Sequence, residues 1–334
     1  MNMKKIIFLA HDPGGYDVVF PVAENFQRES CAADFYCIGP AANLNPLYKI
    51  TPDELLKKIK YQLDYRKITG LVTGTSWGSY AELQAIAACK QAGVPTVAIL
   101  DYWSNYKTRF VCSSGETIYP DYYIVMDQLA REEAIQDGIP QTIIKVLGHP
   151  GLDKYITKQI STNNPGRDFK KALFLSQPLS ALYGEKLGYT EQQALYDCAN
   201  VLTRHNCVLH VKFHPKDEVS FQQCYAEMAV SGNLFDIIPE YDLIIGMSTM
   251  GLLHAVLMGV PAISYQPNLR ESDMCITNKL GLTKCANSLQ ELELQLALMS
   301  SHDINSCNEL SQKLIWLDGH STNRVAAFIR EVFI

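Results

Sequence analysis

A histidine and two lysines stand together where an apolar segment of the chain ends. Residues 208–217 (VLHVKFHPKD) alternate apolar and polar side chains, as a β-strand does, and then reach Lys212, His214 and Lys216. Ligands of open α/β sheets bind at the carboxyl ends of strands. Because lysines attract anions and an imidazole can donate a hydrogen bond or a proton, we interpret this segment as part of an anion-binding site. A solvated surface position remains the alternative for each lysine.

A second group of polar residues opens a predicted helix further along the chain. Residues 241–265 (YDLIIGMSTMGLLHAVLMGVPAISY) predict a strand, a tight turn at Gly246, a helix and a second strand. Ser248 and Thr249 stand at the start of this helix, whose dipole stabilises a bound phosphate by about 0.3–1 kcal/mol. The two hydroxyls also suit a simple N-cap. The nearby strand end at His214 favours the phosphate interpretation.

The loop Ser176-Gln177-Pro178 follows another predicted strand, at 172–175. Its position at a strand end places Gln177 where a side chain can contact the base or ribose of a nucleotide. The alternative is that Gln177 is only a turn residue beside Pro178.

The first half of the chain supplies candidates for a general base. Asp12 follows the predicted first strand and precedes Gly14 and Gly15, which allow the backbone to approach a ligand closely. Asp101 follows a later strand, and His11 is a third candidate. Asp12 has the stronger case, although a capping role is the alternative for this residue and a structural role for Asp101.

Other polar and aromatic residues follow the strands of the first half. Thr75 and Ser76 lie in a loop that leads into a predicted helix, and Trp103 follows Asp101. These residues are candidates for binding an acceptor, whereas Trp103 also suits packing at a domain surface. A second His-Pro pair, at His149, lies at the predicted hinge, and we interpret it as structural.

The strands and helices that position these residues alternate along the whole chain. In the first half, strands are predicted at 6–10, 34–38, 70–73, 96–100, 122–126 and 144–147, and helices at 18–28, 51–68, 81–91 and 129–138. In the second half, strands are predicted at 172–175, before His214, at 243–245 and at 260–265, and helices at 191–202, 252–257, 288–299 and 322–333. This alternation predicts mostly parallel sheets covered by helices on both faces.

Turn-forming residues at 163–166 (NNPG) mark a predicted domain boundary. We therefore divide the chain into domains 1–160 and 161–334, and the last helix can return to pack on the first domain. Two helix starts are predicted to be capping boxes, in which Thr51 pairs with Glu54 and Thr190 pairs with Gln193.

Composition excludes several classes of protein. A chain of 334 residues with 47% hydrophobic content is large enough for two cores, and a net charge of -6 without a long basic run argues against a nucleic-acid partner. The apolar run 6–10 is too short for a signal peptide or a membrane span. Ten cysteines without a C-x-x-C pair indicate reduced thiols in a cytoplasm, and no D-x-D motif suggests a metal site.

These features resemble the GT-B glycosyltransferase architecture, in which two Rossmann-like, doubly wound α/β domains face a central cleft. Residues 119–153 resemble the superfamily of UDP-GlcNAc 2-epimerases and glycosyltransferases. The pairs Gln177-Pro178, His214-Pro215 and Ser248-Thr249 resemble the QP, HP and serine/threonine motifs of bacterial transferases that use CMP-activated acidic sugars. Those are the capsular Kdo transferases and the sialyl- and polysialyltransferases. An acidic motif of several sialyltransferases, Asp/Glu-Asp/Glu-Gly, is missing from the first half.

The resemblance implies a metal-independent glycosyltransferase that needs no cofactor and moves a nonulosonate or Kdo from a CMP-sugar to a surface-glycan or glycoconjugate acceptor. It implies catalytic roles for Asp12 and His214. The implied nucleotide-sugar site comprises Ser176, Gln177, Pro178, Lys212, His214, Pro215, Lys216, Gly246, Ser248 and Thr249. The implied acceptor site comprises His11, Gly14, Gly15, Thr75, Ser76, Asp101 and Trp103.

Three other functions fit the same motifs. A UDP-sugar-dependent transferase or a UDP-GlcNAc 2-epimerase would use the same scaffold with another nucleotide. A CDP-glycerol-type phosphotransferase would carry a similar His-Pro pair and serine-rich loop. A non-catalytic nucleotide-binding module is the fourth hypothesis. A cytoplasmic enzyme in peripheral contact with the inner membrane face is the expected setting, and membrane attachment is left open.

Overall fold

The structure is a computed structural model, and it describes residues 5–29, 32–76, 79–157, 169–301 and 317–333. The chain folds into two compact units. Unit 1 comprises Met1–Lys154 and Leu314–Ile334, and unit 2 comprises Tyr155–Lys313. The predicted boundary at 160/161 and the turn-forming residues at 163–166 lie outside the described residues.

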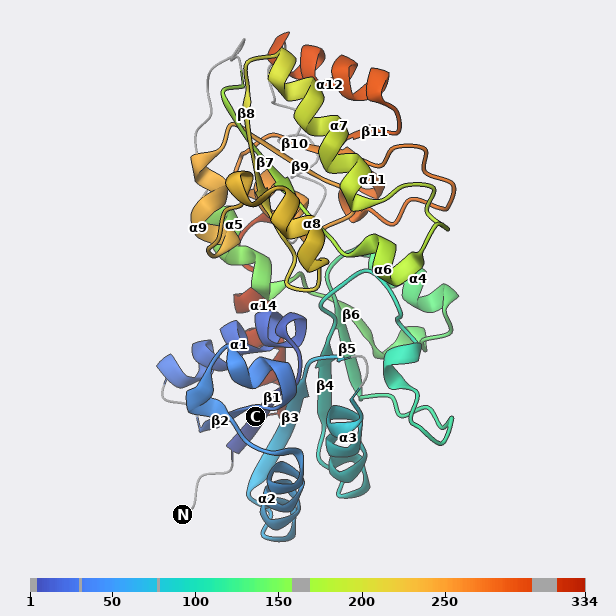
Figure 1. Ribbon diagram of the computed structural model, residues 1–334. Helices are drawn as coiled ribbons and strands as arrows, with labels where there is room; N and C mark the ends of the chain where they lie inside the picture. The colour runs from blue at the N-terminus through green and yellow to red at the C-terminus, as the bar shows by residue number, and fades with distance from the viewer. Residues whose placement is uncertain (1–4, 30–31, 77–78, 158–168, 302–316, 334) are drawn as a thin grey trace. The chain divides into compact units, whose positions relative to one another are not determined.

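Unit 1 is built on a sheet of six parallel strands in the order β2-β1-β3-β4-β5-β6 (Figure 1). The strands are β1 (Lys5–Ala10), β2 (Ala33–Cys37), β3 (Ile68–Thr73), β4 (Thr96–Ile99), β5 (Tyr122–Val125) and β6 (Ile144–Val146). Most strand residues are buried, as expected for a parallel sheet with both faces covered.

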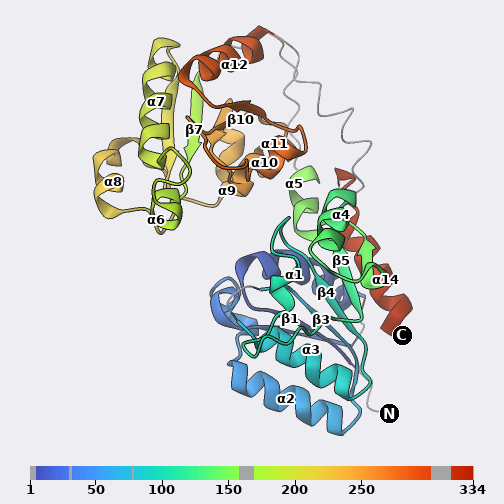
Figure 2. The same cartoon turned by 90° about the vertical axis from the view of Figure 1, so that its right-hand side faces the viewer.

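Helices cover both faces of this sheet. Helix α1 (Pro13–Arg28) and the C-terminal helix α14 (Ser321–Phe333) pack on one face, where Ile6, Phe8 and Ala10 of β1 point into a shared core. Helices α2 (Pro52–Asp64) and α3 (Ala81–Gln91) lie on the other side (Figure 2). The unit also contains α4 (Gln128–Gln136) and the 3-10 helices Gly39–Asn43, Pro46–Tyr48, Thr108–Phe110, Gln141–Ile143 and Pro150–Leu152.

Helix α14 is attached to unit 1 through specific contacts. Both carboxylate oxygens of Asp153 accept hydrogen bonds from its first turn, from Ser321 N–H at 3.1 Å and Thr322 N–H at 2.8 Å. At its other end, the Phe333 ring lies on Gly70 of β3, where a Cβ atom would stand 2.0 Å from the ring. A residue other than glycine at position 70 would therefore displace the end of this helix.

Unit 2 is built on a sheet of five parallel strands in the order β11-β10-β9-β7-β8. The strands are β7 (Lys171–Leu175), β8 (Val208–Lys212), β9 (Leu243–Gly246), β10 (Ala262–Tyr265) and β11 (Lys284–Ala286). Helices α7 (Glu191–Arg204) and α12 (Leu289–Ser301) share one core with this sheet (Figure 2). The described residues of unit 2 also form α6 (Leu179–Tyr183), α8 (Val219–Cys224), α9 (Leu234–Ile237), α10 (Met250–Leu257), α11 (Ile276–Lys279) and the 3-10 helices Ala226–Met228 and Ile238–Glu240. Helix α5 (Asp153–Thr157) spans the division between the units.

The predicted α/β fold with doubly wound parallel sheets is confirmed, and three local predictions need correction. The helix predicted at 51–68 ends at Asp64, and Ile68 is the first residue of β3. Helix α1 begins at Pro13 rather than at Val18, because Asp12 caps it and proline suits the first helical position. The capping box at Thr51 and Glu54 is confirmed. At Thr190 only half of the box forms, since Gln193 donates its side-chain amide to Asp197 instead of returning to the cap.

Candidate functional site

The strand order of each unit singles out one place at the carboxyl edge of its sheet. In unit 1 the order reverses direction between β1 and β3, and in unit 2 it reverses between β7 and β9. The loops that leave such a pair of strands diverge toward opposite faces, which creates the crevice where open α/β sheets bind ligands. The sequence motifs described above follow these strands.

In unit 2, hydrogen bonds connect the loop that follows β7 to the loop after β9 and to the last residue of β8. The side-chain oxygen of Gln177, after β7, accepts a hydrogen bond from Ser248 N–H, after β9, at 2.9 Å. The backbone N–H of Ser176 donates to the carbonyl oxygen of Lys212, at the end of β8, at 3.0 Å. The structure therefore brings the three short motifs to one edge of the sheet, and Gln177 bridges the reversal point.

The start of α10 contains the predicted pair of hydroxyl residues. Thr249 is the N-cap, and its side-chain oxygen accepts a hydrogen bond from Gly251 N–H at 3.2 Å. Gly246 ends β9, where a Cβ atom would stand 2.9 Å from the Thr249 methyl group. Thr249 thus caps the helix, as one of the two interpretations expects. Ser248 is buried beside it, one residue before the cap.

His214 lies in a tight turn that fixes its ring. The imidazole Nδ1 accepts a hydrogen bond from Lys216 N–H at 3.1 Å, and His214 N–H donates to Asp217 Oδ2 at 2.8 Å. Asp217 N–H donates in turn to the His214 carbonyl oxygen at 3.0 Å. His214 is half-buried, whereas the Asp217 residue is only 5% exposed. Asp217 was not predicted from the sequence, where it was only the last residue of the segment 208–217.

The two predicted lysines differ in their surroundings. Lys212 donates from Nζ to the carbonyl oxygen of Gly232 at 2.7 Å, so its ammonium group holds a neighbouring loop. Lys216 is exposed, as is Pro215. Pro178 is buried and immediately precedes α6. A ligand at this edge would meet Lys216 more readily than Lys212, because the Lys212 ammonium already has a partner.

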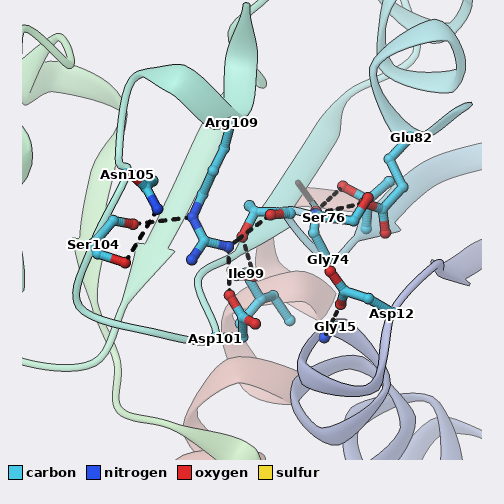
Figure 3. Close-up of polar contacts among 12 residues, drawn as sticks. Asp12, Gly15, Gly74, Ser76, Glu82, Ile99, Asp101, Ser104, Asn105 and Arg109 are labelled. Carbon is cyan, nitrogen blue, oxygen red and sulfur yellow. Dashed lines mark hydrogen bonds and ion pairs between the residues drawn. The ribbon is translucent and has the colours of Figure 1, made fainter. Parts of the chain in front are cut away.

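In unit 1, a buried arginine binds the residues that follow β3 and β4 (Figure 3). Arg109, which is 8% exposed, donates from one terminal nitrogen to Asp101 Oδ1 at 2.5 Å, to the Thr75 carbonyl at 2.7 Å and to the Thr75 hydroxyl at 3.0 Å. Its Nε donates to the carbonyl of Ser104 at 3.1 Å. Asp101 is therefore held in an ion pair with Arg109, and Asp12 stays the stronger candidate for the base.

A buried carboxyl group that the sequence analysis missed lies beside this cluster. Glu82, in the first turn of α3, is 3% exposed and accepts hydrogen bonds at Oε2 from Ser76 N–H at 2.8 Å and Ser76 Oγ at 2.6 Å. Its other oxygen is buried and has no hydrogen-bond partner in the part of the chain that the structure describes. Burial raises the pKa of Glu82 to about 7, and the charges of Asp12 and Asp101 add to this rise. The only sequence signal was an acidic residue directly after a strand-end loop.

Asp12 lies at the reversal point of the unit 1 sheet. Its Oδ1 accepts the hydrogen bond of Gly15 N–H at 2.7 Å, so it caps α1 (Figure 3). Burial raises the pKa of Asp12, and the Asp101 carboxylate raises it further. Gly15 and Gly74 are in close contact, since a Cβ atom on Gly74 would stand 2.8 Å from the Gly15 Cα and 3.1 Å from Glu82 Oε1. Asp12, Glu82 and Asp101 consequently influence one another.

The remaining candidates of unit 1 occupy positions with different environments. A Cβ atom on Gly14 would stand 1.9 Å from Asp101 Oδ2, so the glycine allows α1 to approach Asp101. The Nδ1 atom of His11 is buried and has no hydrogen-bond partner among the residues that the structure describes, and burial lowers the pKa of this histidine. Trp103 is 4% exposed and donates from its indole to Asp127 at 2.8 Å. Its side chain is therefore engaged inside unit 1.

His149 also belongs to the interior of unit 1. Its Nε2 lies 3.0 Å from the carbonyl oxygen of Asp101, and its ring is stacked with Trp103. Burial lowers the pKa of His149, which favours the neutral imidazole. These contacts fit the structural role expected for the second His-Pro pair.

The described residues contain neither a cluster of metal ligands nor a membrane-spanning helix. Within them, no group of three or more His, Cys, Asp or Glu side chains is arranged to hold a metal ion. No helix in the same part of the chain is long and apolar enough to cross a membrane.

Comparisons with known proteins identify the fold. No protein-family model and no curated protein sequence matches the chain. The UDP-GlcNAc 2-epimerase of Methanocaldococcus jannaschii superposes with a TM-score of 0.69 at 12% identity, covering 98% of this chain and 99% of that enzyme. A lipopolysaccharide outer core galactosyltransferase superposes with a TM-score of 0.56 at 14% identity, covering 98% and 99%. The chain has the GT-B fold.

A third similar structure is the UDP-GlcNAc 2-epimerase of Neisseria meningitidis bound to UDP-GlcNAc, with a TM-score of 0.64 at 9% identity and coverage of 98% and 100%. Epimerases and a glycosyltransferase thus share the fold of this chain along its whole length. The predicted GT-B resemblance is confirmed at the level of the fold. At these identities, the likeness indicates no particular family within that fold.

Proposed function

We propose that the protein is a glycosyltransferase that uses a nucleotide-activated sugar and binds the donor phosphate at the β7/β9 edge of unit 2. The observation that supports this most strongly is the Gln177–Ser248 hydrogen bond, which joins two motif loops at the reversal point, beside the end of β8 that leads to His214. Three sequence motifs that converge at the reversal point of a parallel sheet are what a ligand-binding crevice requires.

Two of these loops, after β8 and β9, offer groups suited to an anion. The N-terminus of α10, with Ser248 and Thr249, favours negative charge, and His214 offers Nε2, the ring nitrogen that does not accept from Lys216. Preorganised donors of this kind stabilise the charge that develops on a departing phosphate. Gln177 and the adjoining Ser176 and Pro178 would hold the nucleotide beside the phosphate, and Lys216 would add positive charge.

Acceptor activation is assigned to unit 1, with Asp12 as the base. In this scheme the acceptor hydroxyl loses its proton to Asp12, and its oxygen forms a bond to the anomeric carbon of the donor. The bond from that carbon to the phosphate oxygen breaks, and the nucleotide leaves with the electron pair. The raised pKa of Asp12 makes it a better proton acceptor than an ordinary aspartate once ionised. Gly14, Gly15, Thr75 and Ser76 would border the acceptor.

Two observations favour different donors. The QP, HP and serine/threonine motifs favour a CMP-activated acidic sugar, a nonulosonate or Kdo, transferred to a surface-glycan or glycoconjugate acceptor. The full-length likeness to UDP-GlcNAc 2-epimerases favours a UDP-sugar and a second candidate function, either UDP-dependent transfer or epimerisation. We propose the CMP-sugar because it is supported by the residues that converge at the β7/β9 edge.

A thermal-shift screen with CMP, CDP, UDP, GDP and UMP tests this proposal. A ligand that binds only the folded protein stabilises it by about 2.7 kcal/mol at 100 times its Kd, which corresponds to a rise in melting temperature of several degrees. We expect CMP to raise the melting temperature most, and the Ser248→Ala variant to reduce that rise. A rise with UDP alone would favour the second candidate function, and no rise with any nucleotide would contradict a nucleotide site.

A further inference from the structure

The hydrogen bonds around His214 determine which nitrogen of its ring carries the proton. Lys216 N–H donates to Nδ1 at 3.1 Å, so Nδ1 must offer a lone pair to that bond. In the neutral imidazole the proton then resides on Nε2, which is a hydrogen-bond donor. Protonation of Nδ1 would point two N–H groups at each other and break the contact. The turn therefore selects the neutral Nε2–H form of the ring.

Asp217 maintains the turn that creates this selection. Its Oδ2 holds His214 N–H at 2.8 Å, and its own N–H returns to the His214 carbonyl at 3.0 Å. Burial raises the pKa of Asp217, while the Ser176 hydroxyl and His214 N–H lower it. Asp217 Oδ1 and Ser176 Oγ are both buried and have no hydrogen-bond partner among the described residues. The Ser176 hydroxyl is nevertheless near enough to lower the pKa of the Asp217 carboxyl. Asp217 thus stands between the loops of His214 and Gln177.

We infer that His214 acts on the donor phosphate as a neutral hydrogen-bond donor through Nε2–H, and that Asp217 is the positioning residue that keeps the ring in this form. This inference rests on the proposed function. In this step His214 keeps its proton. The bond between the anomeric carbon of the sugar and the phosphate oxygen breaks, and the nucleotide keeps the electron pair. The Nε2–H group stabilises the negative charge that results on the phosphate. A phosphate monoester such as CMP has a second pKa of about 6, so its oxygen can leave near neutral pH without being protonated.

Charged groups near this turn affect its pH dependence. Among the described residues, Lys212 and Lys216 share the segment of His214, Asp217 closes the turn, and Glu191 at the start of α7 acts on Asp217 through its charge. Glu191 accepts two hydrogen bonds from Ser180 and therefore stays in place. A neutral donor requires none of these groups to titrate during the reaction.

The first experiment compares His214→Gln with His214→Ala in the full chain. Loss of one preorganised donor lowers turnover by about 10²–10³-fold, which we expect for the alanine variant. Glutamine supplies an uncharged N–H donor at a similar reach, and we expect its turnover to exceed that of the alanine variant by roughly tenfold. Wild-type turnover should not fall as the pH rises from about 6 to about 8, where imidazoles titrate. The inference would be overturned if both variants lost the same amount of turnover and if wild-type turnover fell between about pH 6 and pH 8.

The second experiment reads the ring directly and needs no substrate. The 15N spectrum of protein with labelled histidines contains signals from 8 residues, and the His214→Gln variant identifies that of His214. We expect the neutral Nε2–H form in the wild type and in Asp217→Asn, whose amide oxygen can still accept from His214 N–H. Asp217→Ala should give a mixture of the two neutral forms. An Nδ1–H ring in the folded wild type would overturn the inference whether or not a nucleotide binds.

Adding CMP to the labelled protein separates this inference from the proposed function. If CMP changes the Nε2 signal of His214 and leaves its Nδ1 signal unaffected, the result supports both the proposed nucleotide site and the inference about His214. A wild-type Nε2–H ring whose signals do not respond to CMP, UDP or CDP would contradict the proposed nucleotide site, and it would remove the phosphate partner that the inference assigns to His214. The role of Asp217 in fixing the ring would still be measured by its two variants.

Discussion

Replacing Asp12 with asparagine is expected to lower turnover by about 10²–10⁴-fold, the usual contribution of a general base. Asparagine caps helices as well as aspartate does, so the Gly15 N–H bond and the start of α1 should survive. The donor phosphate is assigned to unit 2, and CMP affinity should therefore stay within about twofold of the wild-type value. Steady-state kinetics and a CMP titration of the same variant measure both quantities.

The matched control for this variant lies in the same helix. Asp17 is exposed and pairs with Lys154, so Asp17→Asn removes a carboxylate near the start of α1 without touching the buried cluster. We expect nearly unchanged turnover from this control. Because burial raises the pKa of Asp12, the acid limb of the wild-type pH profile should lie above the range of an ordinary aspartate. Wild-type turnover in Asp12→Asn would transfer the role of base to His11 or Asp101.

Replacing Glu82 with glutamine is expected to change the pH dependence of stability. Below pH 4.5, the ordinary value, the carboxyl is protonated in the folded and unfolded chain alike. As the pH rises toward the folded pKa of about 7, the unfolded chain releases this proton first, and the wild type loses stability. Glutamine has no proton to release. The free energy of unfolding of Glu82→Gln should therefore gain roughly 2–3 kcal/mol over that of the wild type between about pH 5 and pH 8.

Urea unfolding at several pH values measures this difference. Glutamine keeps an oxygen for the two donors of Ser76 and places an amide where Oε1 now lies without a partner. Glu191 provides a matched control, because it accepts the same pair of donors from Ser180 in unit 2. Glu191→Gln shows how the loss of a serine-bound carboxylate changes the free energy of unfolding at a site that lacks Asp12 and Asp101. A pH-independent difference for Glu82→Gln would contradict the raised pKa.

Burial of the Glu82 carboxyl group lowers the stability of the folded protein near neutral pH, and this cost suggests that Glu82 has a functional role. Perturbed carboxyl groups cluster at functional sites, and Glu82 lies at the reversal point of the unit 1 sheet with Asp12. The contact of Gly15 with Gly74 keeps the two loops close enough for Glu82 to influence Asp12. The same edge in unit 2 contains the three motif loops, so both units concentrate polar chemistry at corresponding places.

Much of this fold could be predicted because apolar segments repeat with the periods of strands and helices. The strand before His214 and the helix at 81–91 follow from such patterns, and α3 spans Ala81–Gln91 as predicted. A strand end is also readable from sequence, which explains why Gln177, His214 and Ser248 were found together. The start of α1 was misplaced because the apolar pattern begins later than the cap at Asp12.

Contacts between polar side chains that are distant in the sequence could not be predicted from these patterns. Arg109 is 8 residues from Asp101 and 34 from Thr75, and its ion pair depends on how a 3-10 helix folds back across the strand ends. Glu82 has no pattern that distinguishes it from a solvated helical glutamate. The sequence around Trp103 likewise gives no sign of the hydrogen bond that its indole donates to Asp127. Periodicity reveals which face of an element is buried but not which polar group meets which.

A crystal structure of the protein with CMP tests the central claim most directly. The account predicts the phosphate at the β7/β9 edge of unit 2, within hydrogen-bonding distance of His214 Nε2 and of the groups at the start of α10, with Gln177 beside the nucleotide. CMP bound at another edge of either sheet, or at this edge with its phosphate directed away from His214 and Ser248, would contradict it.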